Sequence, residues 1–355
     1  MQKAIILTSG ILDTVDAKTA HGLIRESERF HIVGIIDDTH AGKDAGQVLD
    51  GIYRNIPIFA TIAEAMSTEP VYCIIGVATT GGMFPSDMLE MIRTAIENKL
   101  SIVNGLHDYL SERPDMRELA EKNSVELLDI RKPKSPKDLH FWTGEILDLA
   151  TPVIAVIGTD CALGKRTATR LLVKACQNEG IRAQMIFTGQ TGWLQGGKYG
   201  FIFDSTLNDF VSGELENAIL TCVKETKPDV VFLEGQSALR NPSGPCGAEF
   251  LLSGQARHVI LVHSPTREFF DEEPHFGKIP SIESEIKLIN LYGSEVIALA
   301  LNTQNCTIEE AITFRDFYES SLKIPVLIPL EEGCDKFLPV IKGLIEQSQM
   351  LTKQP

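Results

Sequence analysis

Short runs of hydrophobic residues alternate along the chain with longer stretches in which hydrophobic residues recur at helical spacing. A short apolar run between polar residues is typical of a strand buried on both faces, whereas helical spacing is typical of an amphipathic helix. Strands that alternate with helices favour a parallel sheet covered by helices. The pattern therefore predicts an α/β fold.

The alternation falls into two parts, which residues 129–137 separate. This segment contains two prolines and four basic residues and breaks the periodicity, so it indicates an exposed connection. We predict one domain over residues 1–135 and a second over residues 136–355. The predicted strands of the first part lie at residues 4–8, 31–36, 71–77 and 100–103, and its helices at residues 17–29 and 86–99. The predicted strands of the second part lie at residues 153–157, 182–187, 230–233, 258–262, 296–301 and 325–328, and its helices at residues 165–179, 213–224, 282–291, 308–322 and 336–347.

A glycine-bounded loop with a lysine joins the first strand of the second part to its first helix. Its sequence over residues 158–167 is Gly-Thr-Asp-Cys-Ala-Leu-Gly-Lys-Arg-Thr. Such a loop turns backbone N–H groups inward, the helix N-terminus adds a positive dipole end, and the lysine adds a mobile ammonium. We predict that it holds phosphates; the alternative is a structural glycine-rich turn. The predicted cofactor-binding residues are Gly158, Thr159, Asp160, Cys161, Gly164, Lys165, Arg166 and Thr167.

The spacing of this loop differs from that of a standard Walker A loop. Five residues separate its first glycine from Gly-Lys, as in the loop of dethiobiotin synthetase, which it resembles. Arg166 stands where a magnesium-binding hydroxyl is expected, and Thr167 follows one position later. The displaced hydroxyl argues against an ordinary Mg-nucleotide hydrolase. Arg166 either adds a second positive charge for the ligand or points to solvent.

Composition narrows the classes of partner. The 355 residues carry a formal net charge of −15, which argues against nucleic acid and against an anionic membrane, because both require a basic face. The apolar runs are strand-sized and shorter than a membrane span. The seven cysteines are scattered without Cys-x-x-Cys spacing, which indicates reduced thiols and no metal site. We therefore expect a cytoplasmic protein with a small-molecule substrate.

Polar residues follow the second and third predicted strands of the second part. Gln190 and Thr191 lie in a glycine-rich turn after one strand, and Glu234 and Gln236 follow the other. Ligands of doubly wound sheets bind beyond the carboxyl ends of the strands. Glu234 has the place of a Walker B carboxylate, which holds magnesium through water or accepts a proton. The alternatives are a simple tight turn and a carboxylate paired with a neighbouring cation.

Three further side chains each have two interpretations. His263 ends a predicted strand and is either an acid–base group or a structural imidazole. Asp209 precedes a predicted helix and is either a site carboxylate or a capping or surface residue. Cys161 lies in the phosphate loop, where a helix dipole activates a thiolate. No histidine lies near it in sequence, which argues against nucleophilic catalysis.

The first part of the chain offers a weaker ligand signal. Asp37 and Asp38 end its second predicted strand, where Rossmann sheets carry a ribose-binding carboxylate. However, Gly-x-Gly-x-x-Gly is absent after the first strand, which argues against dinucleotide binding. Gly81 and Gly82 could open a second anion pocket. The alternative is a Rossmann-like domain that binds no ligand and forms an interface.

Distinctive motifs lie along nearly the whole chain, at residues 17–25, 35–42, 103–107, 158–167, 188–192, 208–213 and 233–236. Their sequences and order resemble the DgcN family, P-loop proteins associated with D-glutamate N-acetylation. The resemblance implies an N-terminal Rossmann-like parallel sheet, a C-terminal doubly wound sheet like those of P-loop NTPases, and transfer of acetyl from acetyl-CoA to D-glutamate. The chain departs from the family at Arg240-Asn241-Pro242, where a histidine is expected before the proline.

The resemblance also implies roles for the candidate residues. Coenzyme A carries a pyrophosphate and a ribose phosphate, so a phosphate loop without a magnesium-binding hydroxyl suits acetyl-CoA as cosubstrate. The attacking amine must lose a proton, and the oxyanion that forms needs hydrogen-bond donors. The candidate proton acceptors are Glu234, Asp209 and His263, and the candidate donors are Gln190, Gln236 and the loop amides. The predicted substrate-binding residues are Thr191, Arg240 and Asn241, of which Arg240 offers a cation to the substrate carboxylates.

Two other functions fit the same residues. An ATP- and magnesium-dependent ligase or kinase resembling dethiobiotin synthetase would place Lys165 on the phosphates and Glu234 near magnesium. A nucleotide-sensing switch that couples the two domains would bind without turnover. In each case we expect a homo-oligomer whose ligand is a small molecule.

Overall fold

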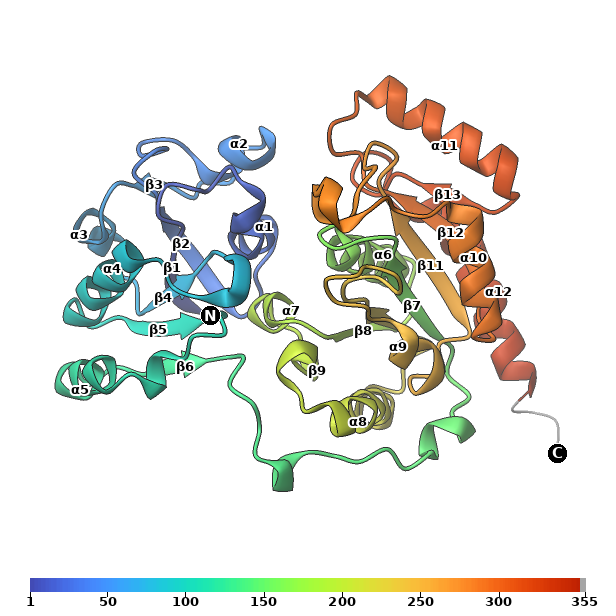
Figure 1. The fold of residues 1–355 in the computed structure, drawn as a ribbon, viewed down its shortest axis with the longest axis horizontal. Helices are drawn as coiled ribbons and strands as arrows, with labels where there is room; N and C mark the ends of the chain where they lie inside the picture. The colour runs from blue at the N-terminus through green and yellow to red at the C-terminus, as the bar shows by residue number, and fades with distance from the viewer. Residues whose placement is uncertain (352–355) are drawn as a thin grey trace. The chain divides into compact units, whose positions relative to one another are not determined.

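The computed structural model describes residues 1–351, which form two compact units (Figure 1). Unit 1 comprises Met1–Lys134 and Gln190–Gly197, and unit 2 comprises Ser135–Gly189 and the chain from Lys198 onward. Each unit is built around one parallel sheet with helices on its faces, so the predicted α/β class is confirmed. The segment Gln190–Gly197 belongs to unit 1 although the predicted division placed it in the second domain.

The sheet of unit 1 has six strands in the order β3-β2-β1-β4-β5-β6. The strand order reverses between β1 and β4, as in Rossmann-like sheets. Side chains alternate along β1, so that Ile5 and Leu7 lie in the core on one face and Ala4 and Ile6 in the core on the other. The strands are β1 (Gln2–Leu7), β2 (Phe30–Ile36), β3 (Ile58–Phe59), β4 (Tyr72–Ile75), β5 (Ser101–Asn104) and β6 (Leu127–Asp129). The helices are α1 (Lys18–Arg25), α2 (Ala45–Asp50), α3 (Ile62–Ala65), α4 (Ser86–Glu97), α5 (Pro114–Asn123) and α7 (Gln190–Leu194).

The sheet of unit 2 has seven strands in the order β13-β12-β11-β7-β10-β8-β9. Its central strand β7 is buried throughout, with Val153 and Ile157 in the core on one face and Ile154 and Val156 in the core on the other. The strands are β7 (Val153–Gly158), β8 (Ala183–Phe187), β9 (Tyr199–Gly200), β10 (Val230–Glu234), β11 (His258–His263), β12 (Glu295–Leu301) and β13 (Val326–Leu327). The helices are α6 (Lys165–Asn178), α8 (Asn208–Thr226), α9 (Ala248–Leu252), α10 (Ile282–Leu291), α11 (Ile308–Leu322) and α12 (Leu338–Leu351).

Every strand and helix that the hydrophobic pattern predicts overlaps an element of the same type. The pattern missed mainly short elements, among them β3, β9, α3, α7 and α9. Elements of two to five residues contain too few positions to show a period. Helix α8 begins at Asn208, before the predicted start at residue 213.

The chain leaves unit 2 after β8 to supply α7 to unit 1. Leu194 is fully buried in the unit 1 core. The Arg29 guanidinium lies 4.0 Å from the centre of the Trp193 ring, and its Nε donates to the Trp193 carbonyl at 2.7 Å. Gln195 donates to the carbonyls of Gly22 and Glu26 in α1 and just beyond it. These contacts tie the segment to unit 1.

Two buried glutamates of α8 hold the segment that leads into unit 2. The Glu216 carboxylate accepts hydrogen bonds from the backbone N–H groups of Thr143, Gly144 and Ile146. Glu214 accepts from the backbone N–H of His140 at 2.9 Å. The exposed connection predicted from two prolines therefore continues into a segment that is anchored to a helix.

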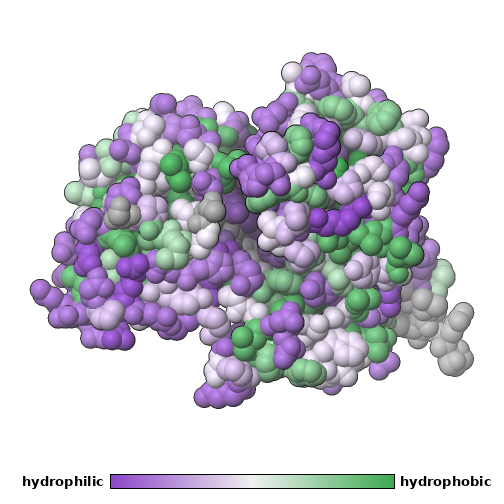
Figure 2. Space-filling view, viewed as in Figure 1, coloured by the Kyte–Doolittle hydropathy of each residue, from purple (hydrophilic) through white to green (hydrophobic). Residues whose placement is uncertain are grey.

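No helix within residues 1–351 is long and apolar enough to cross a membrane. In the view of Figure 2, hydrophobic residues are interspersed with hydrophilic ones on the visible face.

Candidate functional site

The predicted phosphate loop connects the carboxyl end of β7 to the amino end of α6 in unit 2. Gly164 ends the loop at φ +84°, a left-handed conformation that glycine adopts without strain. The N-cap residue of α6, a helix of 14 residues, is this glycine, which has no side chain to cap the helix. The first backbone N–H groups of α6 and the positive end of its dipole lie where the loop joins the helix, and such a position favours an anion.

Lys165 lies folded against this loop. Its side chain is buried, and its Nζ donates to the Asp160 carbonyl at 2.6 Å. Burial lowers the pKa of the ammonium, and the neighbouring Cys161 and Asp160 oppose that shift. An ammonium has three N–H donors, so donors remain for a phosphate oxygen when it reaches the loop.

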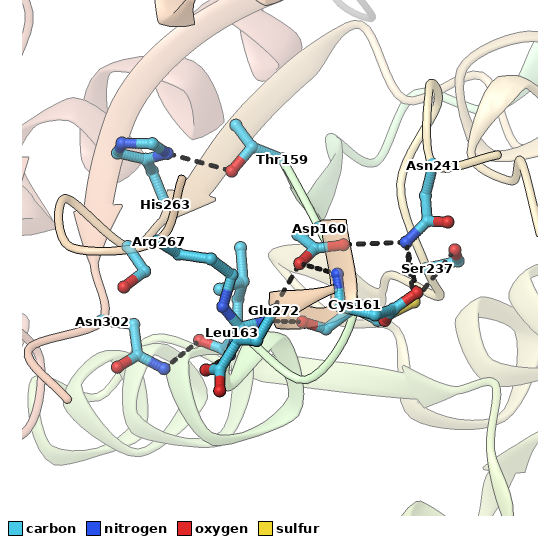
Figure 3. Close-up of polar contacts among 12 residues, drawn as sticks. Thr159, Asp160, Cys161, Leu163, Ser237, Asn241, His263, Arg267, Glu272 and Asn302 are labelled. Carbon is cyan, nitrogen blue, oxygen red and sulfur yellow. Dashed lines mark hydrogen bonds and ion pairs between the residues drawn. The ribbon is translucent and has the colours of Figure 1, made fainter. Parts of the chain in front are cut away.

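A polar network fixes the backbone of the loop (Figure 3). The Asp160 carboxylate is fully buried and accepts from the Asn241 amide at 2.8 Å and from Arg267 Nη1 at 3.0 Å. Arg267 Nη1 also donates to the Cys161 carbonyl at 2.8 Å, and the Asp271 N–H donates to Asp160 at 2.9 Å. A buried carboxylate requires such partners. Asp160 and Asn241, which the sequence analysis assigned to the ligand, here stabilise the loop itself.

Cys161 faces Ser237, with its Sγ 3.2 Å from the Ser237 Oγ. Burial raises the pKa of this thiol. Metal-ligating atoms of Asp160, Cys161 and Asp271 lie within 4.8 Å of one another. However, both oxygens of Asp160 already accept hydrogen bonds, and the Arg267 guanidinium beside them repels a cation.

Glu234 is the last residue of β10, the strand that pairs with β7, and β7 leads into the phosphate loop. Its carboxylate is buried and accepts from the Thr188 N–H at 3.1 Å. Burial raises the pKa of Glu234, while the positive charges of Arg166, Lys165 and Arg170 oppose the rise. The charge of Arg166 therefore favours the ionised form of Glu234. Gln236, two residues after Glu234, donates to the Thr188 hydroxyl at 3.0 Å. The structure thus gathers Glu234, Gln236 and the loop in one unit.

His263 ends β11 and contacts the phosphate loop directly. Its Nδ1 lies 3.0 Å from the Thr159 hydroxyl, and its Nε2 lies 3.5 Å from the Tyr318 hydroxyl of α11. Burial lowers the pKa of His263 to about 4. The imidazole is therefore neutral at physiological pH, when it is able to hold the side chain of Thr159 in place.

Three other candidates, Gln190, Thr191 and Asp209, have different surroundings. Gln190 and Thr191 belong to unit 1, where Gln190 accepts from Arg131 at 2.8 Å and Thr191 lies 3.3 Å from the Thr19 hydroxyl. Asp209 is exposed in the first turn of α8 and lines a cavity of about 390 Å³ with Trp142 and Leu252 among others.

Arg240 has an internal partner. Its Nε donates to the Glu285 carboxylate of α10 at 2.6 Å, and its Nη1 donates to the Ser284 hydroxyl at 2.8 Å. This ion pair competes with the predicted role of Arg240 as the cation for substrate carboxylates.

Sequence reasoning missed Arg267, Ser237 and Tyr318. Arg267 follows β11 by four residues, and Ser237 lies three residues after the end of β10, so both stand in loops at the carboxyl edge of the sheet. That position was an available signal for both. Tyr318 lies within a helix far along the chain and carries no such signal.

The comparisons with known proteins agree with the fold. Residues 140–338 match a P-loop domain of unknown function, DUF1611_C, and residues 38–133 match a Rossmann-like domain of unknown function, DUF1611_N. The chain is similar over 97% of its length to all of a DUF1611 family protein from Anabaena variabilis whose crystal structure is known, with 28% identity and a TM-score of 0.88.

Two curated relatives carry the name D-glutamate N-acetyltransferase. The protein from a Pseudoalteromonas species is 30% identical over 286 residues, which are 78% of this chain and 83% of the relative. The protein from Tritonibacter scottomollicae is 27% identical over 340 residues, which are 94% of this chain and 96% of the relative. As its motifs predicted, the chain belongs to the DUF1611 family, in a DgcN-like form with a Rossmann-like and a P-loop domain.

Proposed function

We propose that the protein is an N-acetyltransferase that moves the acetyl group of acetyl-CoA to the amine of D-glutamate. The names of the two curated relatives support this activity. The observation that supports the proposal is the glycine-bounded loop that leads into α6, with the buried Lys165 folded against it and Arg166 next to it in sequence. An arginine in place of the metal-binding hydroxyl suits a pyrophosphate that arrives without magnesium.

The side chains near the loop offer the chemistry that acetyl transfer needs. The α-amine of a free amino acid has a pKa of about 8, so a fraction of it is neutral at physiological pH. Its nitrogen attacks the thioester carbonyl, the C–N bond forms, the C–S bond breaks, and coenzyme A leaves as a thiol. Glu234 is the proton acceptor we favour, because its pKa is raised toward the working pH and it lies at the carboxyl edge of the sheet.

Calorimetry with two ligands tests this proposal against a ligase or kinase. We expect purified protein to bind acetyl-CoA without magnesium, and the variant Lys165→Ala to lose at least about tenfold in affinity, which is about 1.4 kcal/mol. Lys174→Ala is the matched control, because Lys174 is exposed on the same helix. Binding of Mg-ATP without binding of acetyl-CoA would favour the ligase or kinase.

Turnover identifies the acceptor. We expect release of coenzyme A from acetyl-CoA when D-glutamate is present and markedly slower release with L-glutamate and with neutral D-amino acids. Binding of acetyl-CoA without turnover on any amino acid would favour a sensor over an enzyme.

A further inference from the structure

A second concave site of unit 2 lies beside the phosphate loop. It is a cavity of about 280 Å³ between the loop that follows β11 and the loop that follows β12. β11 pairs with β7, the strand that leads into the phosphate loop, so both sites lie on the carboxyl edge of one sheet. The residues that line the cavity include Arg267, Glu268, Phe269, Glu272, Gln304 and Asn305.

Both walls of the cavity are hydrogen-bonded to the phosphate loop. Arg267 lines the cavity and donates to the Cys161 carbonyl and to Asp160. Gln304 lines the other wall, and its N–H donates to the Asn302 side chain at 2.8 Å. Asn302 Nδ2 in turn donates to the Leu163 carbonyl at 3.0 Å (Figure 3). A ligand whose phosphates occupy the loop can therefore extend into the cavity.

The charge of the walls disfavours a second phosphate in the cavity. The Arg267 guanidinium is paired with Asp160 at 3.0 Å and with Glu272 at 2.9 Å, so its positive charge is already compensated. Glu268 adds another carboxylate, which pairs with Lys278. A neutral group fits these walls better than an anion.

The remaining walls suit a flat heteroaromatic group. Phe269 is half-buried and lines the cavity, with the Lys278 ammonium 5.7 Å from the centre of its ring, and aromatic rings stack on nucleobases. Gln304 and Asn305 are exposed amide side chains, each with donor and acceptor atoms. The buried Nε of Arg267 has no hydrogen-bond partner among the described residues, so a donor at the wall is unsatisfied.

We propose that this cavity binds the adenine base of the coenzyme A nucleotide, with Phe269 against the face of the base and Gln304 and Asn305 at its edge. The proposal rests on the proposed function, because coenzyme A is the carrier that the transfer reaction uses. In this arrangement the exocyclic amine of adenine donates to a carboxylate or amide oxygen of the cavity wall, and the ring nitrogens of adenine accept from a side-chain amide. An adenosine diphosphate group also occurs in ATP, so the test separates these two sources.

Affinities for two truncated carriers test the assignment. Acetyl-dephospho-CoA keeps the adenosine, whereas S-acetyl-4′-phosphopantetheine keeps one phosphate and the thioester but lacks the adenosine. We expect wild-type protein to bind the first at least about tenfold more tightly. We expect Phe269→Ala and Gln304→Ala to reduce this preference by about tenfold and about threefold, in keeping with one lost stacking contact and one lost hydrogen bond.

Binding of S-acetyl-4′-phosphopantetheine is the internal control, because a variant that retains it is folded around the phosphate loop. Phe317→Ala is the matched control for Phe269→Ala, since Phe317 is exposed on α11 and outside the cavity. Gln304→Ala changes an exposed side chain and so keeps the test valid if Phe269→Ala fails to fold.

The outcomes separate this proposal from the proposed function. If wild-type protein binds acetyl-CoA but neither cavity variant changes the preference for the adenosine-containing carrier, the adenine site is wrong and the acetyltransferase stands. If the wild-type protein binds neither acetyl-CoA nor either truncated carrier, both proposals fall. If Mg-ATP binds in place of acetyl-CoA and Phe269→Ala abolishes that binding, the cavity is an adenine site but its assignment to coenzyme A is overturned.

Discussion

Burial acts in opposite directions on two titratable side chains near the phosphate loop, Glu234 and His263. It raises the pKa of the Glu234 carboxyl group and lowers that of the His263 imidazole, because in both cases it disfavours the charged form. The positive charge of Arg166 opposes the rise in the pKa of Glu234, whereas burial is the main cause of the lowered pKa of His263. At the residue scale, these two positions therefore predict different pH dependences.

Glu234→Gln should remove the acid limb of the activity profile. Turnover that uses the Glu234 carboxylate as base falls as the pH drops through its pKa, which lies above the value of about 4.3 of a free glutamate. We expect kcat to fall by about 10²–10⁴-fold in the variant. The measurement is the rate of coenzyme A release between pH 4 and 9, with the exposed Glu309→Gln as control. An unchanged profile in Glu234→Gln would exclude Glu234 as the base.

His263→Asn should make unit 2 less sensitive to acid. Because the pKa of His263 is lowered to about 4, the unfolded chain binds a proton below pH 6.5 that the folded chain resists. The free energy of unfolding is therefore unaffected by this histidine above pH 6.5 and decreases as the pH drops from 6.5 toward 4. Between pH 7 and pH 4.5 the wild type should lose about 2 kcal/mol through this group alone.

Urea unfolding at the two pH values measures this difference. Asparagine keeps a polar atom near the Thr159 hydroxyl but does not titrate, so His263→Asn should lose less stability than the wild type over the same interval. His275→Asn, an exposed histidine of the same unit, is the control. Equal losses in the wild type and His263→Asn would contradict the assignment.

At the scale of elements, helix α8 does more than cover the sheet of unit 2. Glu216 and Glu214 lie buried near its middle and accept hydrogen bonds from the segment at residues 140–146. Gly213 allows this segment to approach, because a Cβ there would lie 2.1 Å from the His140 carbonyl oxygen. Helix α8 therefore holds residues 140–146, the segment that leads into the sheet of unit 2, by hydrogen bonds to their backbone.

Glu216→Ala should destabilise unit 2 by at least about 3 kcal/mol, because several backbone N–H groups lose their acceptor on a buried surface. The same substitution at Glu225, which lies on the same helix and forms an exposed ion pair with Lys198, should destabilise the protein much less. Chemical denaturation of the two variants measures the contrast. Similar losses of unfolding free energy in both variants would show that the Glu216 hydrogen bonds do not stabilise unit 2.

At the scale of the whole molecule, each sheet comes from one stretch of sequence, but the two compact units do not. Unit 1 recruits Gln190–Gly197 from between β8 and β9 of unit 2. Leu194 completes the unit 1 core, and Trp193 packs against it. The hydrophobic pattern missed this arrangement because a five-residue helix carries no periodic signal and its packing partner is distant in sequence.

A fragment of residues 1–134 should be less stable than unit 1 in the full chain. It lacks Leu194, whose full burial is worth about 2 kcal/mol, so we expect its melting temperature to be lower by roughly 5–10 °C. A peptide of residues 188–199 added in trans should restore part of the loss. A peptide with Trp193 and Leu194 both replaced by alanine should not, and equal melting temperatures with and without the native peptide would contradict the prediction.

The sequence by itself determined the α/β class, the order of the long elements and the phosphate loop with Lys165, because hydrophobic periodicity and a glycine-bounded loop are local properties of the chain. It also pointed to Glu234 and His263, which end strands and so reach the carboxyl edge of the sheet. Only the tertiary structure decided which of the polar candidates have partners within the protein. Asp160 binds Arg267, Arg240 binds Glu285, and Gln190 belongs to unit 1, since such contacts join residues far apart in sequence through burial and charge pairing.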